Sequence, residues 1–311
     1  MSRFADRIAR DYPVRHTEKE KAELRAYLLR ELKEMGYTAK LQTRESPLAR
    51  GGGSTNVVVG DVDRARIILT AHYDTPLREL LPPLIMPTRP MTSALYQALT
   101  PILAIAAALV ISFAVTMPLN APFWTMPLFL LLLVGMIAYL RFGPGEKNNL
   151  EQNDSGVAAL LETAAALSPR WRGAAAFVFT DGMGGAKAVK KQYPSAAEKT
   201  VISLDCVGAG QEILFLPSRY SRWNTEALDA ILESFDGVAG EGKSCFLKTD
   251  GIVYYPAGNR AFRYSIAVCA CDKLAGFGRI VRPRRTKKID EENLRILKEG
   301  LCRLIAAFGA E

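Results

Sequence analysis

Short blocks of apolar and polar residues follow one another along most of the chain, with spacing that alternates between strand and helix. The clearest helix starts at Thr17, a predicted N-cap whose capping-box partner, Glu20, lies three residues later. The spacing predicts helices at 17–35, 153–168, 184–194, 224–235 and 290–308, and strands at 38–44, 55–62, 65–74, 174–182, 199–208 and 264–271. Strands that alternate with helices predict an α/β sandwich with functional groups at the strand ends.

One block departs from this alternation, because no charged residue occurs between Arg89 and Arg141. It contains two apolar segments, 98–117 and 122–140, joined by the short link PLNA. Each is close to the roughly 20 residues that a helix needs to cross a bilayer. The block therefore predicts a transmembrane hairpin, and the alternative is a pair of helices buried in a soluble core.

The residues that flank the hairpin predict its orientation. Basic residues precede and follow it and are absent from the link, so the positive-inside rule puts both flanks in the cytoplasm; they are Arg78, Arg89, Arg141 and Lys147. Trp124 and Tyr139 lie near the ends of the second segment, where interfacial aromatics are common. The N-terminus lacks the apolar core of a signal peptide. We expect a cell-membrane protein with two spanning helices, cytoplasmic termini and lipids as partners.

The hairpin also predicts the domain organisation. Residues 1–75 and 148–311 are the two parts of one α/β domain, and residues 76–147 are an insertion that carries the hairpin. The five cysteines are an odd number without framework spacing or a CxxC pair, which excludes a disulfide-stapled secreted domain and a structural zinc site. Cys269 and Cys271 would share one face of a strand as buried free thiols.

Charge adds one candidate surface. The net charge is +8, and a basic cluster follows residue 281, with Arg282, Arg284, Arg285, Lys287 and Lys288. No recognition motif accompanies it, so nucleic acid is not an expected partner. Contact with anionic lipid headgroups and a solvated surface loop are the two interpretations left open.

Candidate chemistry lies at the ends of apolar strands and at one helix start. His72 and Asp74 end one strand, Asp205 ends another, and Asp154 begins a helix. Imidazole and carboxylate groups that meet at a sheet edge can bind zinc. Taken singly, His72 could be a core histidine, Asp154 an N-cap and Asp205 a turn former.

The order of the motifs narrows these alternatives. AHYD, NDSGVAALLE, AAFVFTDG, VISLDCVG, TDG and IDEENL follow one another along the chain. This series resembles the co-catalytic zinc aminopeptidase family, which includes aminopeptidase Y and the glutaminyl cyclases. The resemblance implies a three-layer α/β/α sandwich with a mixed central sheet, and two zinc ions that bind a peptide amino terminus and activate a bridging water.

Carried over residue by residue, the resemblance makes His72 and Asp205 metal ligands, Asp154 the carboxylate that bridges both metals, and Asp74 the group that orients His72. Two features of the family are missing. Either Met183 and Gly184 stand where the family has its general-base and ligand glutamates, or that pair is deleted, and no histidine follows His72. A single weakly bound zinc would need a further ligand, for which Asp181, Glu151 and Asp250 are candidates.

Two functions remain open at this stage. The first is a membrane-anchored pseudopeptidase that keeps the cleft and binds, or scaffolds, a peptide or protein. The alternative is an active metallo-exopeptidase that cleaves N-terminal residues from small peptides with one metal or substituted ligands. Loss of the base favours the first, because a positioned general base contributes about 10²- to 10⁴-fold to the rate. His16 is expected at the surface without a role.

Overall fold

A mixed β-sheet lies at the centre of the computed structural model, which describes residues 2–45, 53–78, 83–251, 253, 261–275, 278–282 and 288–310. The strand order is β1-β2-β4-β3-β5-β8-β6-β7, and β9 pairs with β8. The strands are β1 Ala39–Glu45, β2 Gly53–Val59, β3 Ile67–His72, β4 Ala175–Thr180, β5 Thr200–Leu204, β6 Glu212–Pro217, β7 Ser244–Leu247, β8 Ser265–Leu274 and β9 Gly278–Ile280.

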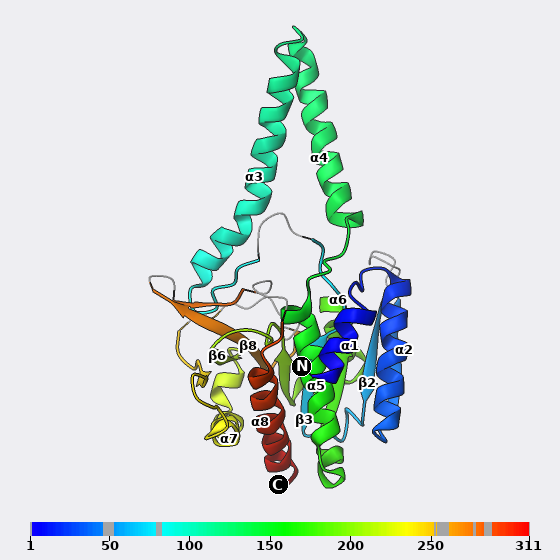
Figure 1. Cartoon of the computed structure of the whole chain (residues 1–311), viewed down its shortest axis with the longest axis vertical. Helices are drawn as coiled ribbons and strands as arrows, with labels where there is room; N and C mark the ends of the chain where they lie inside the picture. The colour runs from blue at the N-terminus through cyan, green and yellow to red at the C-terminus, as the bar shows by residue number, and fades with distance from the viewer. Residues whose placement is uncertain are drawn as a thin grey trace.

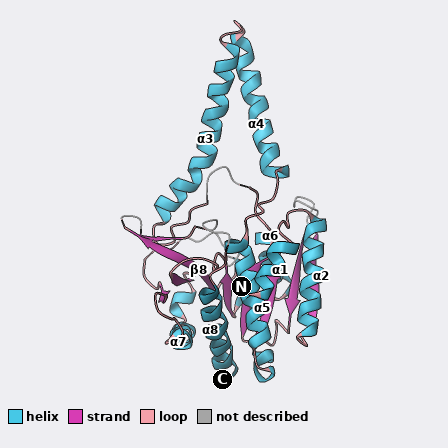
Figure 2. Cartoon of the chain, in the orientation of Figure 1, coloured by secondary structure: helices cyan, strands magenta, loops and turns pink. Residues whose placement is uncertain are grey.

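Helices cover both faces of this sheet (Figures 1 and 2). The α-helices are α1 Arg3–Asp11, α2 Glu18–Glu34, α3 Pro90–Thr116, α4 Thr125–Phe142, α5 Ser155–Ala166, α6 Gly182–Gln192, α7 Thr225–Phe235 and α8 Glu291–Ala310. Helices α1, α2, α5, α7 and α8 share one apolar core with the sheet, whereas α6 packs on the opposite face. The expected α/β architecture with a mixed central sheet is confirmed.

The centre of the sheet is parallel. Strand β3 lies between β4 and β5 and runs parallel to both, and β5 runs parallel to β8. Residues of β3 alternate between the two cores, with Ile67 and Leu69 on the α5 side and Ile68 on the α6 side. A central strand covered on both faces reads as a continuous apolar run, which is why the sequence pattern identified it.

Helices α3 and α4 project from the domain as a hairpin (Figure 1). The apolar window of α3 is 12% buried and that of α4 is 0% buried, so a pair of core helices is the wrong interpretation. Both helices are long and apolar enough to cross a membrane. Near the tip, the hydroxyls of Thr116 and Thr125 form a 2.7 Å hydrogen bond between them.

The ends of the insertion meet in a short two-stranded segment, here called the neck, which consists of residues 76–78 and 144–146. Leu77 and Gly145 form an antiparallel bridge, and the Arg78 N–H donates to the Pro144 carbonyl at 3.1 Å. The Tyr139 hydroxyl donates to the Arg78 carbonyl at 2.8 Å, which ties the foot of α4 to the neck.

Several elements differ from the sequence expectation. Strands β6, β7 and β9 and helix α1 were not predicted. Helix α3 starts at Pro90 and not at residue 98, because proline fits the first helical position and the segment after it continues the helix. Cys269 and Cys271 are buried free thiols in one cluster, as expected.

Candidate functional site

The predicted site residues come from neighbouring elements at one edge of the sheet. His72 ends β3, Asp181 follows β4 and Asp205 follows β5, so the three lie at the carboxyl ends of adjacent parallel strands. Asp154 immediately precedes α5, whose first turn packs closely on β3 and β5. The edge of a parallel sheet is the usual position for a ligand or active site in this fold class.

His72 and Asp205 interact at this edge. The Nδ1 atom of His72 lies 2.9 Å from the hydroxyl of Thr180, at the end of β4. Burial raises the pKa of the Asp205 carboxyl, and the nearby imidazole of His72 partly opposes that shift. Cys206, directly after Asp205, has a φ of 54°, a conformation uncommon for residues other than glycine.

Asp74 shapes the turn that begins α6. Its Oδ1 accepts a 2.9 Å hydrogen bond from the Gly182 N–H, and its carbonyl accepts one from Asn153 at 2.5 Å. Gly182 has a φ of 57°, and a Cβ there would lie 3.2 Å from the Asp74 carboxylate, so the turn requires glycine. That Asp74 orients His72 stays a prediction.

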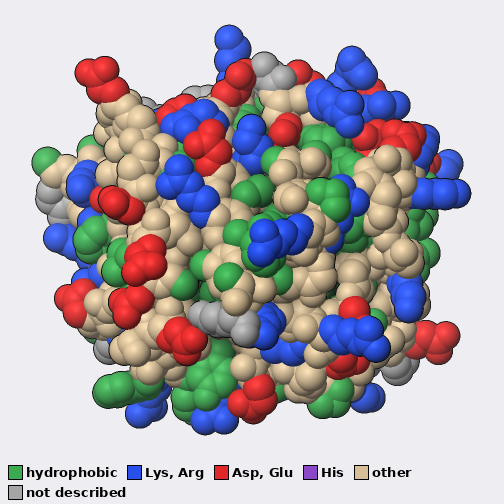
Figure 3. Space-filling view, turned by 90° about the horizontal axis from the view of Figure 1, so that it is seen from below, with side chains coloured by type: hydrophobic (Ala, Val, Ile, Leu, Met, Phe, Trp, Pro, Cys, Tyr) green, Lys and Arg blue, Asp and Glu red, His purple; other side chains and the backbone are tan. Residues whose placement is uncertain are grey.

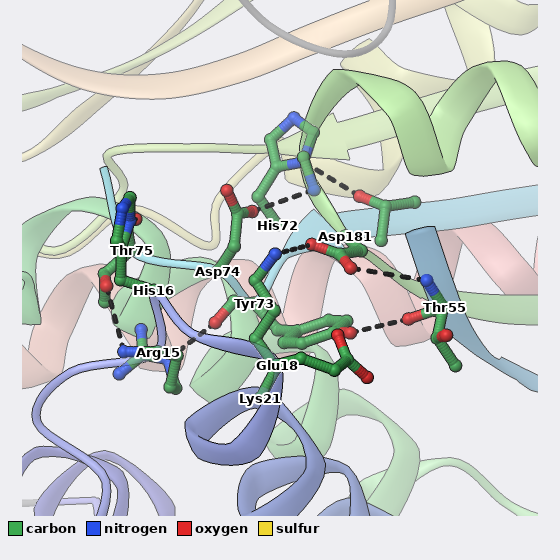
Figure 4. Close-up of polar contacts among 12 residues, drawn as sticks. Arg15, His16, Glu18, Lys21, Thr55, His72, Tyr73, Asp74, Thr75 and Asp181 are labelled. Carbon is green, nitrogen blue, oxygen red and sulfur yellow. Dashed lines mark hydrogen bonds and ion pairs between the residues drawn. The ribbon is translucent and has the colours of Figure 1, made fainter. Parts of the chain in front are cut away.

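A fully buried arginine, Arg15, lies beneath Thr75 and beside Tyr73 (Figure 4). The Nη2 atom of Arg15 donates to the carboxylate of Asp154, in a salt bridge whose side chains are 0% and 2% exposed. Its Nε donates to the Tyr73 carbonyl and its Nη1 to the Tyr12 carbonyl, each at 2.6 Å. Asn149 also donates to the Asp154 carboxylate, at 3.3 Å.

The backbone around Arg15 explains its position. The Arg15 N–H donates to the Thr75 hydroxyl at 2.9 Å, and the Thr75 N–H donates to the Arg15 carbonyl at 3.1 Å. The segment before it is anchored by α1, whose residues Phe4 and Ile8 are buried in the core shared with α5. The N-terminal segment therefore lies along residues 73–75 and directs one cation beneath the sheet edge.

Lys21 makes a second pair of the same kind. Its Nζ lies 2.5 Å from Oδ1 of Asp181, and the Thr55 N–H donates to Oδ2 at 3.3 Å (Figure 4). Burial raises the pKa of the Asp181 carboxyl, and the ammonium of Lys21 partly offsets the shift. Two acids of the site are thus bound to cations from the N-terminal region.

Tyr73 connects these two pairs. It is buried, its hydroxyl donates to the Thr55 carbonyl at 2.5 Å, and it accepts from Nη1 of Arg25 at 3.0 Å. Burial raises the pKa of the Tyr73 hydroxyl, so it acts here as a neutral donor. This packing holds the cations and the strand end in one arrangement.

A cavity of about 510 Å³ opens beside the pair of Lys21 and Asp181. Its described lining comprises His16, Lys21, Arg44, Gly53, Ser54, Asp74, Thr75, Pro76, Leu77, Asp181, Gly182, Gly184 and Lys187. Residues 76 and 77 belong to the neck, so the cavity faces the foot of the hairpin. His16, expected at the surface without a role, is half-buried here and reaches the Thr75 carbonyl at 3.4 Å.

The residues of the site do not fit the two-zinc arrangement that the sequence resemblance implies. Within the described ranges, no three or more His, Cys, Asp and Glu side chains are grouped so that they could hold a metal ion. The Asp154 carboxylate is bound to Arg15, whose charge would repel a metal. The individual roles of His72, Asp154 and Asp205 as ligands stay predictions.

The three candidates for a completing ligand have different positions. Asp181 is at the site but bound to Lys21, and Glu151 is buried in the turn before Asp154. Asp250 cannot contribute, because it follows β7 at the opposite end of the sheet and pairs with Lys248 at 2.6 Å.

The basic cluster is only partly within the described residues. Arg282 and Lys288 are described, whereas Arg284, Arg285 and Lys287 lie outside the described residues. The nearby Arg279 is bound to the carboxylate of Glu212, and its guanidinium lies 3.7 Å from the ring centroid of Phe246. Its charge is therefore compensated.

Sequence reasoning missed Arg15, Lys21 and Tyr73. Arg15 is a single arginine between a proline and a helix cap, and its partner lies 139 residues away. No local pattern marks such a residue. The sequence offered one indirect indication. A carboxylate that is buried at the position of Asp154 needs a cationic partner when the other metal ligands of the family are missing.

No family model matches the chain, and no curated protein matches it. Solved structures share its fold. A glutaminyl cyclase from Porphyromonas gingivalis has a TM-score of 0.58 and 14% identity, over 97% of this chain and 95% of its own. A Zn-dependent exopeptidase from Parabacteroides distasonis has a TM-score of 0.58 and 14% identity, over 98% and 97%. A leucine aminopeptidase precursor from Bacteroides thetaiotaomicron has a TM-score of 0.55 and 15% identity, over 97% and 94%. At these identities the likeness establishes the fold alone.

Proposed function

We propose that this protein is a membrane-anchored, aminopeptidase-like pseudopeptidase whose cleft binds a peptide or protein ligand without hydrolysing it. The observation that carries the proposal is the buried ion pair between Arg15 and Asp154. In the arrangement implied by the resemblance, the carboxylate at this position bridges two metal ions. Here the chain supplies the compensating cation itself.

Electrostatics support the replacement of metal ions by Arg15 as the partner of Asp154. A buried carboxylate without a partner is costly, so Asp154 requires either a metal or a cationic side chain. An arginine cannot lose its proton in a protein, so the charge of Arg15 is permanent. The guanidinium is also bound by two carbonyls, which leaves it no alternative position without loss of those bonds.

The missing base supports the same proposal. Met183 and Gly184 lie in the first turn of α6, Gly184 lines the cavity, and neither residue carries a carboxylate. Without a positioned base, water activation loses about 10²- to 10⁴-fold before any loss of metal is considered. Both steps of the implied chemistry are therefore weakened together.

The cavity supports retained binding. Its volume of about 510 Å³ falls in the range of small-ligand sites. Ser54, Thr75 and the backbone around Gly182 offer polar groups beside Leu77 and Pro76. This mixture suits a short peptide segment with an extended backbone.

The hairpin supports anchoring. Its apolar side chains are exposed over both helices, and a monomeric soluble protein rarely exposes apolar surface on this scale. Tyr139 and Arg141 lie at the foot of α4, Arg89 precedes α3, and Trp124 lies at the tip. We place α3 and α4 across the membrane, in contact with lipids, with the tip of the hairpin on the far side. The α/β domain and both termini then lie on the cytoplasmic side.

The test uses the full-length chain, purified in a non-ionic detergent without chelators. Zinc is measured by elemental analysis, and activity is measured on aminoacyl-naphthylamides and on peptides with N-terminal glutamine. We expect no stoichiometric zinc and no turnover. Zinc that is stoichiometric and lost in His72→Ala, together with exopeptidase activity, would overturn the proposal in favour of a one-metal exopeptidase.

Peptide binding, the second part of the proposal, is measured with a fluorescein-labelled library of synthetic hexapeptides. Gly184→Trp should abolish binding, because a Cβ at residue 184 meets only Ser54 at 3.7 Å and the larger ring would fill the cavity. Gly173→Trp, at an exposed position with open space around it, is the matched control. Equal binding by both variants would exclude this cavity as the ligand site.

A further inference from the structure

A second and larger cavity, of about 900 Å³, lies at the opposite end of the sheet, where β6 ends and β8 begins. Its described lining comprises Lys190, Leu216, Pro217, Ser218, Arg219, Tyr220, Arg222, Gly251, Val253, Ala261, Phe262, Arg263, Ser265 and Ala267. This end of the domain faces away from the hairpin and is the end viewed in Figure 3, where Lys and Arg side chains are interspersed with apolar and acidic ones.

The cavity exists because helix coverage of this sheet face is incomplete. Helix α6 packs against β1, β2 and β4. Within the described part of the chain, no helix covers the same face of β6 and β8, whose residues Leu216 and Ala267 are nearly fully buried at the floor. Phe262 closes one side and is 3% exposed. The floor is therefore apolar and preformed.

The rim of the cavity is cationic. Four basic residues line it, and no acidic residue is found among its described lining residues; the four are Lys190, Arg219, Arg222 and Arg263. The neighbouring carboxylate of Asp250 is bound to Lys248. Like charges that face one cavity repel one another, and a bound anion relieves that repulsion.

Two of these cations are held in place. The guanidinium of Arg263 lies 5.0 Å from the ring centroid of Tyr220 and 5.2 Å from that of Tyr264. Nη1 of Arg222 donates to the Gly251 carbonyl. Arginines that are fixed before binding lose less side-chain entropy when a ligand arrives.

Two buried polar atoms in the same cavity lack partners among the described residues. Ser265 is fully buried, and no described residue forms a hydrogen bond with its hydroxyl oxygen. The Nε atom of Arg222 is buried and likewise has no partner in the described part of the chain. Buried polar groups in folded proteins are almost always satisfied, so two donors left open in one cationic cavity point to a missing acceptor.

We propose that this cavity binds a small organic phosphate. The phosphate oxygens accept from Arg222 and from the Ser265 hydroxyl and are neutralised by the surrounding cations. The apolar part of the ligand lies on Phe262 and Ala267. A phosphate uses several cations and the planar guanidinium fork, and a volume of about 900 Å³ holds a ligand much larger than the ion itself.

The test uses the full-length chain in non-ionic detergent, with inorganic phosphate, adenosine 5′-monophosphate and adenosine as probes in calorimetry. We expect the nucleotide to bind more tightly than inorganic phosphate, adenosine to bind at least tenfold more weakly than the nucleotide, and affinity to fall as salt rises. Arg263→Gln should weaken nucleotide binding about tenfold, because it removes one of the cations that neutralise the phosphate.

Ser265→Ala separates binding from folding. It removes a buried hydroxyl without a partner, so the thermal midpoint should not fall while nucleotide affinity drops several-fold. Arg66→Gln is the charge control, because Arg66 is exposed and does not line the cavity. The proposal is overturned if neither phosphate nor nucleotide binds, if adenosine binds as tightly as the nucleotide, or if Arg263→Gln and Arg66→Gln bind equally. None of these results bears on the hairpin-facing cleft.

Discussion

Arg15 illustrates how one side chain can take over the electrostatic role of a bound ion. A metal ion compensates several acids at once and leaves a position for water. A guanidinium compensates one carboxylate, has no position for water and stays bound through its own backbone. Asp154 can therefore remain buried without any metal, since its charge is compensated within the chain.

Removing that cation should be strongly destabilising. Arg15→Met leaves the Asp154 charge buried without its partner, for which the expected loss is about 3–5 kcal/mol of unfolding free energy, a fall in Tm on the order of 10 °C. Thermal unfolding of the full chain in detergent, followed by tryptophan fluorescence, measures it. Arg10→Ala, an exposed arginine in the same segment, should cost less than about 1 kcal/mol.

The double variant Arg15→Met, Asp154→Leu tests the cause. Replacing both partners removes the unpaired charge, so most of the stability lost in Arg15→Met should return. A double variant as unstable as the single one would show that Arg15 acts through packing and its carbonyl contacts, and not through Asp154.

Replacing Asp205 should stabilise the protein at neutral pH, whereas replacing Arg15 should destabilise it. Burial raises the pKa of this carboxyl, so the folded chain binds its proton more tightly than the unfolded chain. Its contribution to stability is therefore fully present below the unfolded pKa of about 3.9 and is lost as pH rises through the folded pKa. Asp205→Asn should be more stable than the parent at pH 7, with a difference that vanishes below about pH 4.

The measurement is Tm as a function of pH for the parent, for Asp205→Asn and for Asp229→Asn, an exposed carboxyl on α7 that serves as control. A parent chain that is more stable than Asp205→Asn at pH 7 would contradict the prediction. It would mean that the charged carboxylate has interactions stronger than its burial cost.

At the level of elements, local signals predicted some structures and not others. Helix α2 was predictable because its capping box of Thr17 and Glu20 and its apolar spacing all lie within the helix. Strand β6 was not, because EILFLP is a short apolar run without alternation and its pairing with β8 joins residues 49 to 59 positions apart. Helix α1 is short, and its burial depends on packing against α5.

The candidate site divides in the same way. His72, Asp154 and Asp205 were predictable because strand ends and helix starts can be read from the sequence and meet at one sheet edge. The cations of the site were not, because Arg15 reaches Asp154, and Lys21 reaches Asp181, from the N-terminal segment across more than 130 residues. The cavity near Ser265 was not predictable either, since it depends on which strands α6 leaves uncovered.

The neck makes the hairpin removable. Leu77 and Gly145 are paired, and residues 78 and 144 lie opposite each other, so a two-residue Asn-Gly turn can replace residues 79–143. We expect the shortened chain to remain in the supernatant after sedimentation of membranes, and the full chain to sediment with them and require detergent. A full chain found in the supernatant would contradict membrane anchoring.

The shortened chain also has its own control. The core shared by β3 and α5 does not include the excised residues, so the domain should stay folded, but loss of Ile85, which pairs with Val281 and packs in the cluster of β6 and β8, should lower its Tm by several degrees. A large fall in Tm would mean that excision damaged the domain, and the soluble fraction could then be interpreted only after the linker is lengthened.

At the scale of the whole molecule, the two cavities lie at opposite ends of the sheet. The cleft beside Asp74 and Asp181 faces the neck and the foot of the hairpin, whereas the cationic cavity faces away from it. In the proposed orientation, the cleft meets ligands presented at the membrane surface and the second cavity meets molecules of the cytoplasm. The length of the sheet lies between the two cavities, and the adjacent strands β3, β5 and β8 run from one end to the other.

The position of β3 has a consequence for how the protein is made. Its two neighbours, β4 and β5, are both encoded after the hairpin, so a ribosome produces the central strand well before either partner. At roughly 5–20 residues per second, the residues between His72 and the end of β4 take on the order of 5–20 s to synthesise. The hairpin emerges within that interval. With the hairpin in the bilayer, as proposed, the sheet would be completed around a strand already attached to the membrane, and assembly of the domain would begin at its surface.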